Sequence, residues 1–404
     1  MATFRQVIDP IVAVYYVRVV GLQPLDLVLL GTVVLVAGLL FEVPTGVVAD
    51  TYSRKVSVVI GVALSGVCFL AQGLAPILAV IVVAEGLRGV GGTFISGALD
   101  AWIADEIGPD AAAQAYLRFA QVRQLGALVG TLVGTALATV ALGLPIALGG
   151  GLILALALYL AVAMPEHGFR PALHVGRGGL AAMVHTTRQG ARLIRYRPFL
   201  VTLLGVWACL ALASEGHDRL WEAHLLRYFE LPAIGALDAV VWFGVINVGF
   251  MVGSVLGTEA IRRRLDLADN GAVARVLLLL SAVEVAGLLV FALAGSFALA
   301  AAAYVGAQSF RRMTGPVFTG WVNRHLDPRY RATVLSMGGQ VDALGQLTGG
   351  PLVGLIATVA SLRLGMAASA ALLLPTLPLL ARAGRQAVAE AAAPLSLERP
   401  PGGS

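Results

Sequence analysis

Between two long apolar runs the chain reads Gly46-Val47-Val48-Ala49-Asp50-Thr51-Tyr52-Ser53-Arg54-Lys55. Asp50, Arg54 and Lys55 form one of the few dense charge clusters in the sequence. Apolar runs of about 20 residues are long enough to cross a membrane as helices. The stretch is therefore expected to be a short polar turn at a membrane surface, with a membrane-spanning segment on either side.

The composition also indicates a membrane protein. Of the 404 residues, 58% are hydrophobic and 13% are charged, whereas a soluble domain carries about 25% charged residues. Lipid can cover the apolar faces that a soluble fold would have to bury. The net charge is +5, but basic residues near membrane ends mainly report topology, so we expect no nucleic-acid partner. Cys68 and Cys209 lie inside apolar runs, so we expect no disulfide, metal site or other cofactor.

Twelve apolar runs are long enough to span a bilayer. They cover residues 3–21, 26–49, 56–75, 77–103, 116–141, 144–163, 198–226, 236–260, 273–294, 296–322, 333–359 and 362–381. This pattern predicts an all-α membrane protein with twelve transmembrane helices in two pseudo-symmetric six-helix bundles. We place the N-terminal bundle at 1–164, a cytoplasmic central loop at 165–197, the C-terminal bundle at 198–381 and a disordered cytoplasmic tail at 382–404.

Basic residues concentrate in alternate loops. They include Arg54 and Lys55, the arginines of the central loop, Arg262 to Arg264, and Arg382 with Arg385. The opposite loops, such as 73–76 and 143–145, are short and carry no charge. Because cytoplasmic loops carry the excess of arginine and lysine, both termini are predicted to be cytoplasmic, in the inner cell membrane.

The two halves repeat each other in sequence. The segment from Trp102 to Pro109 resembles that from Trp321 to Pro328, and Gln121, Leu125, Gly126 and Gly130 recur as Gln340, Leu344, Gly345 and Gly349. A fainter repeat pairs Asp9, Arg18 and Leu22 with Asp218, Arg227 and Leu231. Either the first helix has fewer turns before its aspartate than the seventh, or the start codon is placed too far downstream, or the pairing is accidental. Homologous halves are typical of secondary transporters.

The turn at 46–55 resembles the signature loop of the major facilitator superfamily, commonly written G-x-L-A-D-R-x-G-R-K. The matching residues are Gly46, Ala49, Asp50, Arg54 and Lys55; Thr51 and Ser53 depart from the pattern. The resemblance implies that Asp50 anchors the cytoplasmic closure between the halves, with Arg54 beside it. A plain basic turn would explain Arg54 and Lys55, but not the aspartate.

Two further features resemble those of proton-coupled, drug-efflux-like members of this family. Arg88 is followed by Gly92 in helix four, and the resemblance implies a role for the arginine in proton transfer. Gly126, Gly130 and Gly134 have the spacing of the family's antiporter motif, but its Gly-Pro pair is absent. Close helix packing through small residues is the alternative explanation of these glycines.

Charged residues inside the membrane are costly, about 2.5–3.5 kcal/mol each, and usually face a cavity. In helix four, Glu85, Arg88 and Asp100 fall on one arc with Gly92 and Ser96. We therefore expect this face to line a substrate cavity or to take part in proton coupling. The alternative is that Glu85 and Arg88, three residues apart, simply neutralise each other.

Helix seven carries a second polar stripe, formed by Trp207, Ser214, Asp218 and Glu222. An aromatic ring, a hydroxyl group and acids on one face suit an amphipathic or cationic substrate. The alternative is that this segment is a solvated helix end outside the bilayer.

Glu42 and Pro351 complete the candidate set. Glu42 precedes Pro44 in helix two and either titrates with the proton gradient or caps the backbone that the proline frees. Pro351 follows Gly350 in helix eleven, where it either kinks the helix so that the halves can rock or serves ordinary packing. Asp342 and Glu284 are further intramembrane acids with weaker context.

No nucleotide-hydrolysis motif is present, because Lys55 is the only lysine and valine follows it. We therefore predict a transporter rather than an enzyme, driven by an ion gradient or by the substrate's own gradient. The resemblance to the family implies a monomer. The preferred function is proton-coupled efflux of small amphipathic molecules by alternating access. The alternatives are an uptake symporter or uniporter, and a non-transporting sensor on the same fold.

Overall fold

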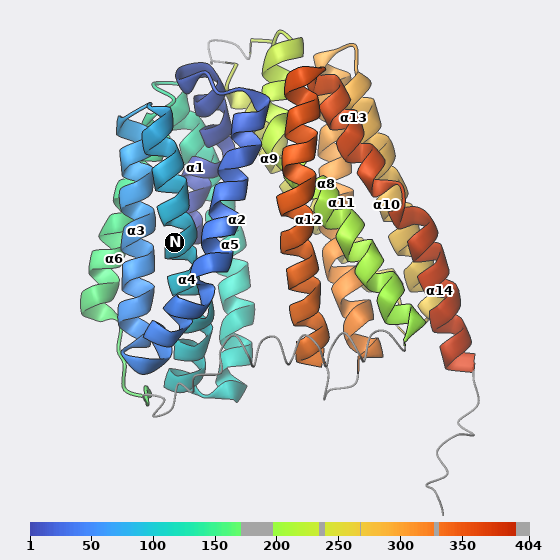
Figure 1. Cartoon of the computed structure of the whole chain (residues 1–404), viewed down its shortest axis with the longest axis horizontal. Coiled ribbons are helices and arrows are strands. Elements are labelled where there is room, and N and C mark those ends of the chain that lie inside the picture. The colour runs from blue at the N-terminus through green and yellow to red at the C-terminus, as the bar shows by residue number, and fades with distance from the viewer. Residues whose placement is uncertain (171–196, 234–238, 267, 327–330, 393–404) are drawn as a thin grey trace, which may run out of the picture.

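The computed structural model describes residues 1–170, 197–233, 239–266, 268–326 and 331–392. Regular structure in these residues is entirely helical, and the helices form two bundles that stand side by side (Figure 1). The first bundle holds α1 to α6 and the second α8 to α14. Of the predicted central loop, residues 171–196 lie outside the described residues.

The N-terminal bundle is built from α1 (Ala2–Tyr15) with the short π-helix η1 (Tyr16–Val20), α2 (Pro24–Thr51), α3 (Arg54–Leu74), α4 (Leu78–Ile107), α5 (Pro109–Ala138) and α6 (Leu144–Ala163). The C-terminal bundle is built from α8 (Pro198–Tyr228), α9 (Val241–Arg264), α10 (Asn270–Leu293), α11 (Phe297–His325), α12 (Arg331–Val359), α13 (Leu362–Leu373) and α14 (Thr376–Ala392). With α1 and η1 counted as one span, and α13 and α14 as another, each bundle has six spans.

The twelve-span, two-bundle fold predicted from the apolar runs is confirmed. Eight spans of the described residues are long and apolar enough to cross a membrane by length and composition alone. The remaining four are short or carry charge at mid-helix: α1 has 14 residues, and α11 holds Arg311 and Arg312. These four spans pack against other helices of the bundles, which reduces their contact with lipid.

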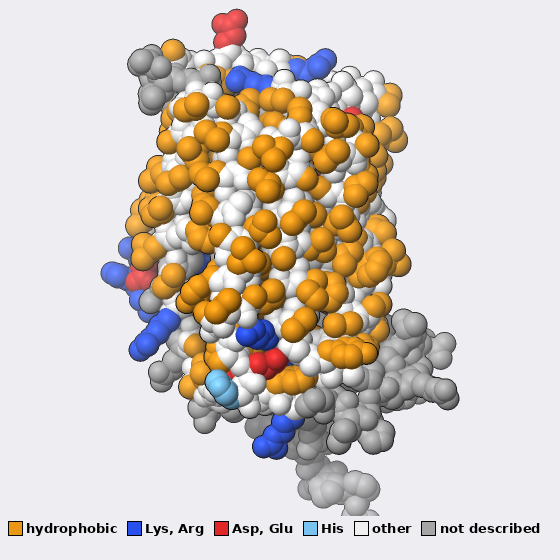
Figure 2. Space-filling model, turned by 90° about the vertical axis from the view of Figure 1, so that its left-hand side faces the viewer, with side chains coloured by type: hydrophobic (Ala, Val, Ile, Leu, Met, Phe, Trp, Pro, Cys, Tyr) orange, Lys and Arg blue, Asp and Glu red, His pale blue; other side chains and the backbone are white. Residues whose placement is uncertain are grey.

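The outer surface is apolar, as lipid contact requires. Figure 2 shows one side of the N-terminal bundle, where hydrophobic side chains cover most of the face and the charged ones in view lie toward its top and its lower part. Leu40 is 67% exposed and Val162 is 87% exposed. Exposure of this extent on long helices is unfavourable in water and neutral in hydrocarbon. The chain is a multi-pass membrane protein.

Glycines let the first helix of each bundle lie against a later one. A side chain at Gly126, Gly130 or Gly134 of α5 would strike Thr3, Gln6 or Val7 of α1. These three positions therefore hold a close contact between two helices, which is the packing explanation of their spacing.

The same arrangement recurs in the C-terminal bundle. A side chain at Gly345 or Gly349 of α12 would strike Ala211 or Leu212 of α8. Gly345 and Gly349 are the residues that repeat Gly126 and Gly130 in sequence, so the repeat marks one helix contact used twice.

The two bundles touch near one end. We call the end with the Tyr52–Ser53 turn and Arg262 to Arg264 the basic end, and the opposite one the far end. At the far end, the Leu25 amide of α2 donates to Thr358 Oγ1 of α12 at 3.0 Å, and Val28 packs against Gly350 and Gly354. In Figure 1 the bundles meet at the top and diverge downward.

Two predicted boundaries are wrong. Helix α5 begins at Pro109 rather than at 116, because the helix extends over an alanine-rich segment, interrupted by Asp110 and Gln114, that precedes the apolar run. Residues 382–392, predicted to be disordered, continue α14 to Ala392. In this segment Ala383 and Ala387 are buried at 0% and 1% exposure, so packing on the bundle holds a helix that hydropathy alone does not reveal. Residues 393–404 lie outside the described residues.

The two aspartates of the fainter repeat lie at different distances from the first residue of their helices. Asp9 lies seven residues after Ala2, where α1 begins, and Asp218 lies twenty residues after Pro198, where α8 begins. The span ends in the π-helix, which Gly21 terminates with a φ of 76°. Only glycine adopts this left-handed backbone readily.

Candidate functional site

A hollow of about 1060 Å³ lies between the two bundles. Its walls come from α1 and α5 on one side and from α9 and α11 on the other. The lining residues run from mid-helix toward the basic end. The bundles are thus closed together near the far end and hollow between their other halves, as expected for one state of an alternating-access protein.

The hollow presents both charged and apolar side chains. Charges come from Arg5, Asp9, Arg123, Glu259 and Arg312, and apolar surface comes from Phe250, Met251, Val255 and Pro316. Arg5 pairs with Asp9 at 3.3 Å, and the Arg312 guanidinium lies 4.5 Å from the centre of the Phe250 ring. Such a lining suits a molecule that has both ionic and apolar groups.

An arginine shared by two acids lies next to this wall. Arg311 of α11 donates to Asp218 of α8 through two contacts, Nη1–Oδ1 at 2.5 Å and Nη2–Oδ2 at 2.9 Å. Its Nε lies 3.9 Å from Glu284 Oε1 of α10. The Asp218 side chain is 41% exposed, whereas that of Glu284 is 2% exposed. One guanidinium thus connects an accessible carboxylate with a buried one.

Glu284 has no hydrogen-bond partner for either carboxylate oxygen among the described residues. A buried polar group in this position is unusual and marks a candidate functional group. Polar neighbours of the Asp218–Arg311 pair include His217, whose Nε2 lies 3.6 Å from Asp218 Oδ1, and Gln308, whose Oε1 accepts from Arg311 Nη1 at 3.4 Å.

The N-terminal bundle holds a separate buried network. Arg88 pairs with Glu85, which also accepts from Gln72 Nε2 at 3.0 Å and from the Tyr16 hydroxyl at 3.3 Å. Arg88 is 12% exposed and lies over the Phe69 ring. The arginine is therefore turned into the bundle, where Glu85 neutralises it as its spacing of three residues allows.

Another ion pair lies at the contact between the bundles. Arg219 donates to Glu215 at 2.8 Å within α8, and Glu215 fills the space beside Gly31 of α2, where a side chain would collide with it. Glu215 is 8% exposed, and Glu222 and His224 are 4% and 0% exposed. The interpretation of this part of α8 as a solvated helix end is therefore wrong.

The polar stripe predicted on helix seven separates in the structure. Trp207 packs edge-on against Phe318 at 5.3 Å, inside the C-terminal bundle. The Ser214 hydroxyl donates to the Ala211 carbonyl of its own helix, and Glu222 is buried with one oxygen unpartnered among the described residues. Asp218 alone of the four joins the Arg311 cluster.

The polar arc predicted on helix four is interrupted. Ser96 has φ −50° and ψ −130°, so α4 bends there and a regular 100° projection does not continue to Asp100. Asp100 is exposed and accepts from the Tyr116 hydroxyl at 3.3 Å. Gly92 is also exposed, and a side chain added there would meet no atom of the described residues within 4 Å. The two ends of the arc thus belong to different surroundings.

Glu42 is exposed on α2. The Thr45 hydroxyl, rather than the Glu42 carboxylate, bonds the backbone beside Pro44, at 2.8 Å to the Phe41 carbonyl and 3.2 Å to that of Glu42. Pro351 lies in α12 directly after Gly350, which contacts both Val28 and Glu215. The eight side chains predicted for the cavity or for proton coupling are not among those that line the hollow.

The turn at 46–55 is tighter than its sequence indicates. Helix α2 continues to Thr51 and α3 begins at Arg54, with Ser53 as its N-cap. Arg54 pairs with Asp105 at the end of α4 and lies 4.0 Å from Asp50. Asp50 is 57% exposed, and a side chain added at Gly46 would meet no described atom within 4 Å.

Glu166, just after α6, ties the same turn to the rest of its bundle. It accepts from the Ser53 hydroxyl at 2.7 Å and from the Lys55 amide at 2.9 Å. These partners, like Asp105, belong to the N-terminal bundle. With the bundles apart at the basic end, the turn is held within its own half of the molecule.

Sequence reasoning missed Arg311, Arg312, Asp105 and Glu166. A signal for the first two was present, since two adjacent arginines lie in the middle of the apolar run 296–322 and charges at that depth are rare without a role. No local pattern singles out Asp105 or Glu166, because their partners come from other helices.

A membrane protein whose two six-span bundles meet near one end over a charged hollow has the architecture of a secondary transporter. The chain belongs to the Major Facilitator Superfamily, whose family model matches residues 1–339. It is accordingly a transporter and not an enzyme.

A relative from Bacillus subtilis (strain 168), described as the uncharacterized MFS-type transporter YxaM, is 22% identical over 339 residues, which is 82% of this chain and 80% of the relative. A bacterial homolog of the human lysosomal transporter Spinster, solved in an inward-facing and unoccupied conformation, aligns with a TM-score of 0.70 and 16% identity over 97% of this chain and 96% of that one. The nucleoside transporter NupG aligns with a TM-score of 0.69 and 11% identity, covering 96% of each chain. These structural similarities support the fold.

Proposed function

We propose that this transporter couples proton movement to the export of small amphipathic, ionisable molecules across the inner cell membrane, as a monomer. The observation that carries the proposal is the cluster of Asp218, Arg311 and Glu284 beside the hollow. Arg312, the residue next to Arg311, is part of the hollow's wall. A rearrangement of the cluster can therefore move a side chain that would contact the substrate.

The coupling follows from charge balance. Two acids share one guanidinium in this cluster. A proton on Asp218 frees Arg311 to pair with Glu284, and a proton on Glu284 leaves Arg311 to Asp218. Because α8, α10 and α11 each contribute one of the three groups, exchanging partners changes the attraction of α8 and α10 for α11, the helix that forms part of the hollow's wall.

The substrate class follows from the hollow. Arg123, Arg312 and Glu259 supply charges, while Phe250 and Met251 supply apolar area. An amphipathic molecule can use both, whereas a purely apolar one would leave the charges without water or a partner.

The gate is proposed to work at the turn 46–55. Gly46, Asp50, Arg54 and Lys55 stand at the basic end, where the bundles are apart, and Asp50 is exposed. In the opposite state the bundles would meet there, and we propose that Asp50 then pairs across the interface while Arg54 holds it in position. With both termini in the cytoplasm, the present state opens inward.

Uptake by symport is the second candidate. The spacing of Gly126, Gly130 and Gly134 suggested antiport. These glycines pack against α1, however, and this packing accounts for their spacing without antiport. Export and uptake both require the same proton cluster, so the direction is tested separately from the coupling.

The test uses purified full-length protein in liposomes that contain a pH-sensitive dye. A panel of amphipathic cations, zwitterions and anions is added with and without an imposed pH gradient. Proton movement that depends on a compound, and that is lost in Asp218→Asn but kept in Asp266→Asn, supports the proposal. Substrate transport with no proton movement would contradict coupling. If the compound instead accumulates on the side toward which the protons flow, the protein is a symporter and not an exporter.

A further inference from the structure

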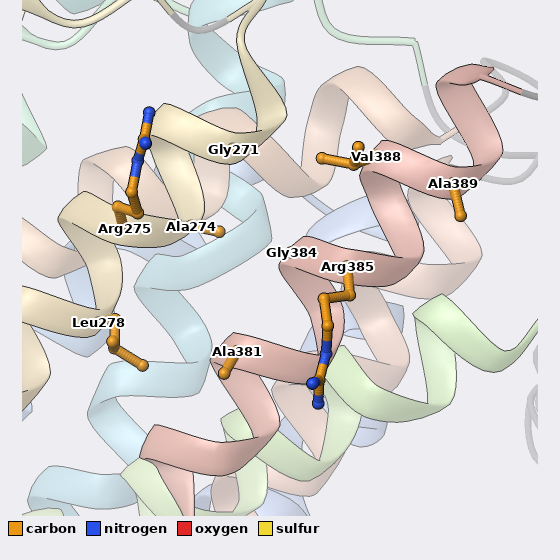
Figure 3. Close-up of a pocket in the computed structure, with 9 residues that line it drawn as sticks. All are labelled: Gly271, Ala274, Arg275, Leu278, Ala381, Gly384, Arg385, Val388 and Ala389. Carbon is orange, nitrogen blue, oxygen red and sulfur yellow. The ribbon is translucent and has the colours of Figure 1, made fainter.

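A groove between α10 and α14 opens on the outer surface of the C-terminal bundle at the basic end. It has a volume of about 610 Å³. Figure 3 shows Arg275 with Ala274 and Leu278 on α10, and Arg385 with Ala381 and Gly384 on α14; the two guanidinium groups point in opposite directions along the groove. Both arginines are exposed.

The groove has an apolar floor because the helices approach closely. A side chain at Gly384 of α14 would lie 2.5 Å from the Ala274 side chain of α10. The small residues let the two backbones meet, and longer side chains such as Leu278 and Val388 form the rims. Leu279, next along α10, is 60% exposed, so the groove continues onto a surface that faces lipid.

A second hollow of about 450 Å³ lies between α9 and α10 and shares Arg275 with the groove. It adds Arg264 from the end of α9. The described residues place no acidic side chain in an ion pair with Arg264, Arg275 or Arg385. Three arginines therefore line these two neighbouring hollows without the acidic partners, among the described residues, that Arg262 and Arg263 have in Glu259.

We propose that this groove binds an anionic phospholipid. Guanidinium groups match phosphate oxygens in geometry and charge, and basic pockets between helices at the membrane surface suit anionic headgroups. The apolar floor takes the acyl chains. A free phosphate would use the arginines but not the floor, and a neutral lipid would use the floor but not the arginines. The assignment of the lipid to the inner leaflet rests on the proposed topology. The binding site itself does not depend on that topology.

The test measures lipid binding and not transport. Native mass spectrometry of delipidated full-length protein is used with phosphatidylglycerol, with phosphatidylcholine of the same chains, and with inorganic phosphate as competitor. The double variant Arg275→Gln/Arg385→Gln is compared with Arg324→Gln/Arg331→Gln, which removes two other arginines at the same end. We expect the first variant to bind phosphatidylglycerol about tenfold more weakly, and the second to bind like the parent.

A photocrosslinking amino acid at Leu278, in an otherwise unchanged chain, gives an independent measurement. It should form an adduct with phosphatidylglycerol in preference to phosphatidylcholine. Equal binding of the two lipids by the parent protein, unchanged binding by the first variant, or displacement of the lipid by inorganic phosphate would each overturn the proposal.

Discussion

Asp218 and Arg311 lie 93 positions apart in sequence and face each other in a two-contact ion pair that joins α8 to α11. Arg311 also lies 3.9 Å from the buried Glu284, and the next residue, Arg312, lines the inter-bundle hollow. Because the Asp218 side chain is 41% exposed, protons and water have access to one acid of the cluster while the other is enclosed.

Replacing Asp218 by Asn should abolish compound-dependent proton movement. The substitution removes the charge that holds Arg311 and keeps the shape of the side chain. Loss of a charge-assisted hydrogen bond should also lower stability by about 2 kcal/mol, measured as thermal unfolding in detergent. Asp266→Asn, at an exposed loop position, is the control; proton movement in Asp218→Asn equal to that of the control would disprove the role.

Replacing Glu284 by Gln should separate stability from coupling. Neither carboxylate oxygen has a hydrogen-bond partner among the described residues, so a neutral side chain of the same size should leave the melting temperature equal or higher. Proton movement should nevertheless be lost, because Arg311 then has a single acid to pair with. A variant that unfolds at a much lower temperature would show that Glu284 is a structural residue.

Substituting Gly130 by Leu should destabilise the N-terminal bundle by about 1–3 kcal/mol. The new side chain would collide with Thr3 and Gln6 of α1. Gly151→Leu on α6 is the matched control, because a side chain there would meet none of the described atoms within 4 Å. Size-exclusion profiles and melting temperatures compare the two, and equal values would contradict the close packing of α5 on α1.

A disulfide between Leu25→Cys and Thr358→Cys should stop transport reversibly. The Leu25 amide and the Thr358 hydroxyl are 3.0 Å apart in this state, so oxidation should lock the far end closed, in a background with Cys68 and Cys209 replaced by Ala. Reducing agent should restore the activity, and each single cysteine should have no effect. Transport that continues in the crosslinked protein would exclude separation of the bundles at the far end.

Some of the site was predictable because its cause is local. Glu85 and Arg88 are three residues apart on one helix, and they pair. The role of the repeated glycines, such as Gly126 and Gly345, was also indicated by their spacing. Residues three or four positions apart lie on the same face of a helix, so the glycines form one face that a neighbouring helix can approach closely. In both cases the residues that interact, or the face that they make, lie within one helix.

Other parts depended on which helices become neighbours. Asp218 was singled out, but its partner Arg311 was not, and Trp207 proved to pack against Phe318. The bend at Ser96 breaks an arc that regular helix geometry would continue. A helix face cannot be assigned to the cavity, to lipid or to another helix until the neighbouring helices are placed.

The sequence by itself determined the membrane location, the twelve spans and their division into two related halves. Hydropathy acts on each run independently, and backbone hydrogen bonds within a helix satisfy the polar groups of that run whatever surrounds it. The tertiary structure alone decided which charges meet, which end of the bundles is closed and where the hollow lies. These depend on contacts between residues far apart in the chain, and lipid-exposed and cavity-exposed faces differ only in what is packed beside them.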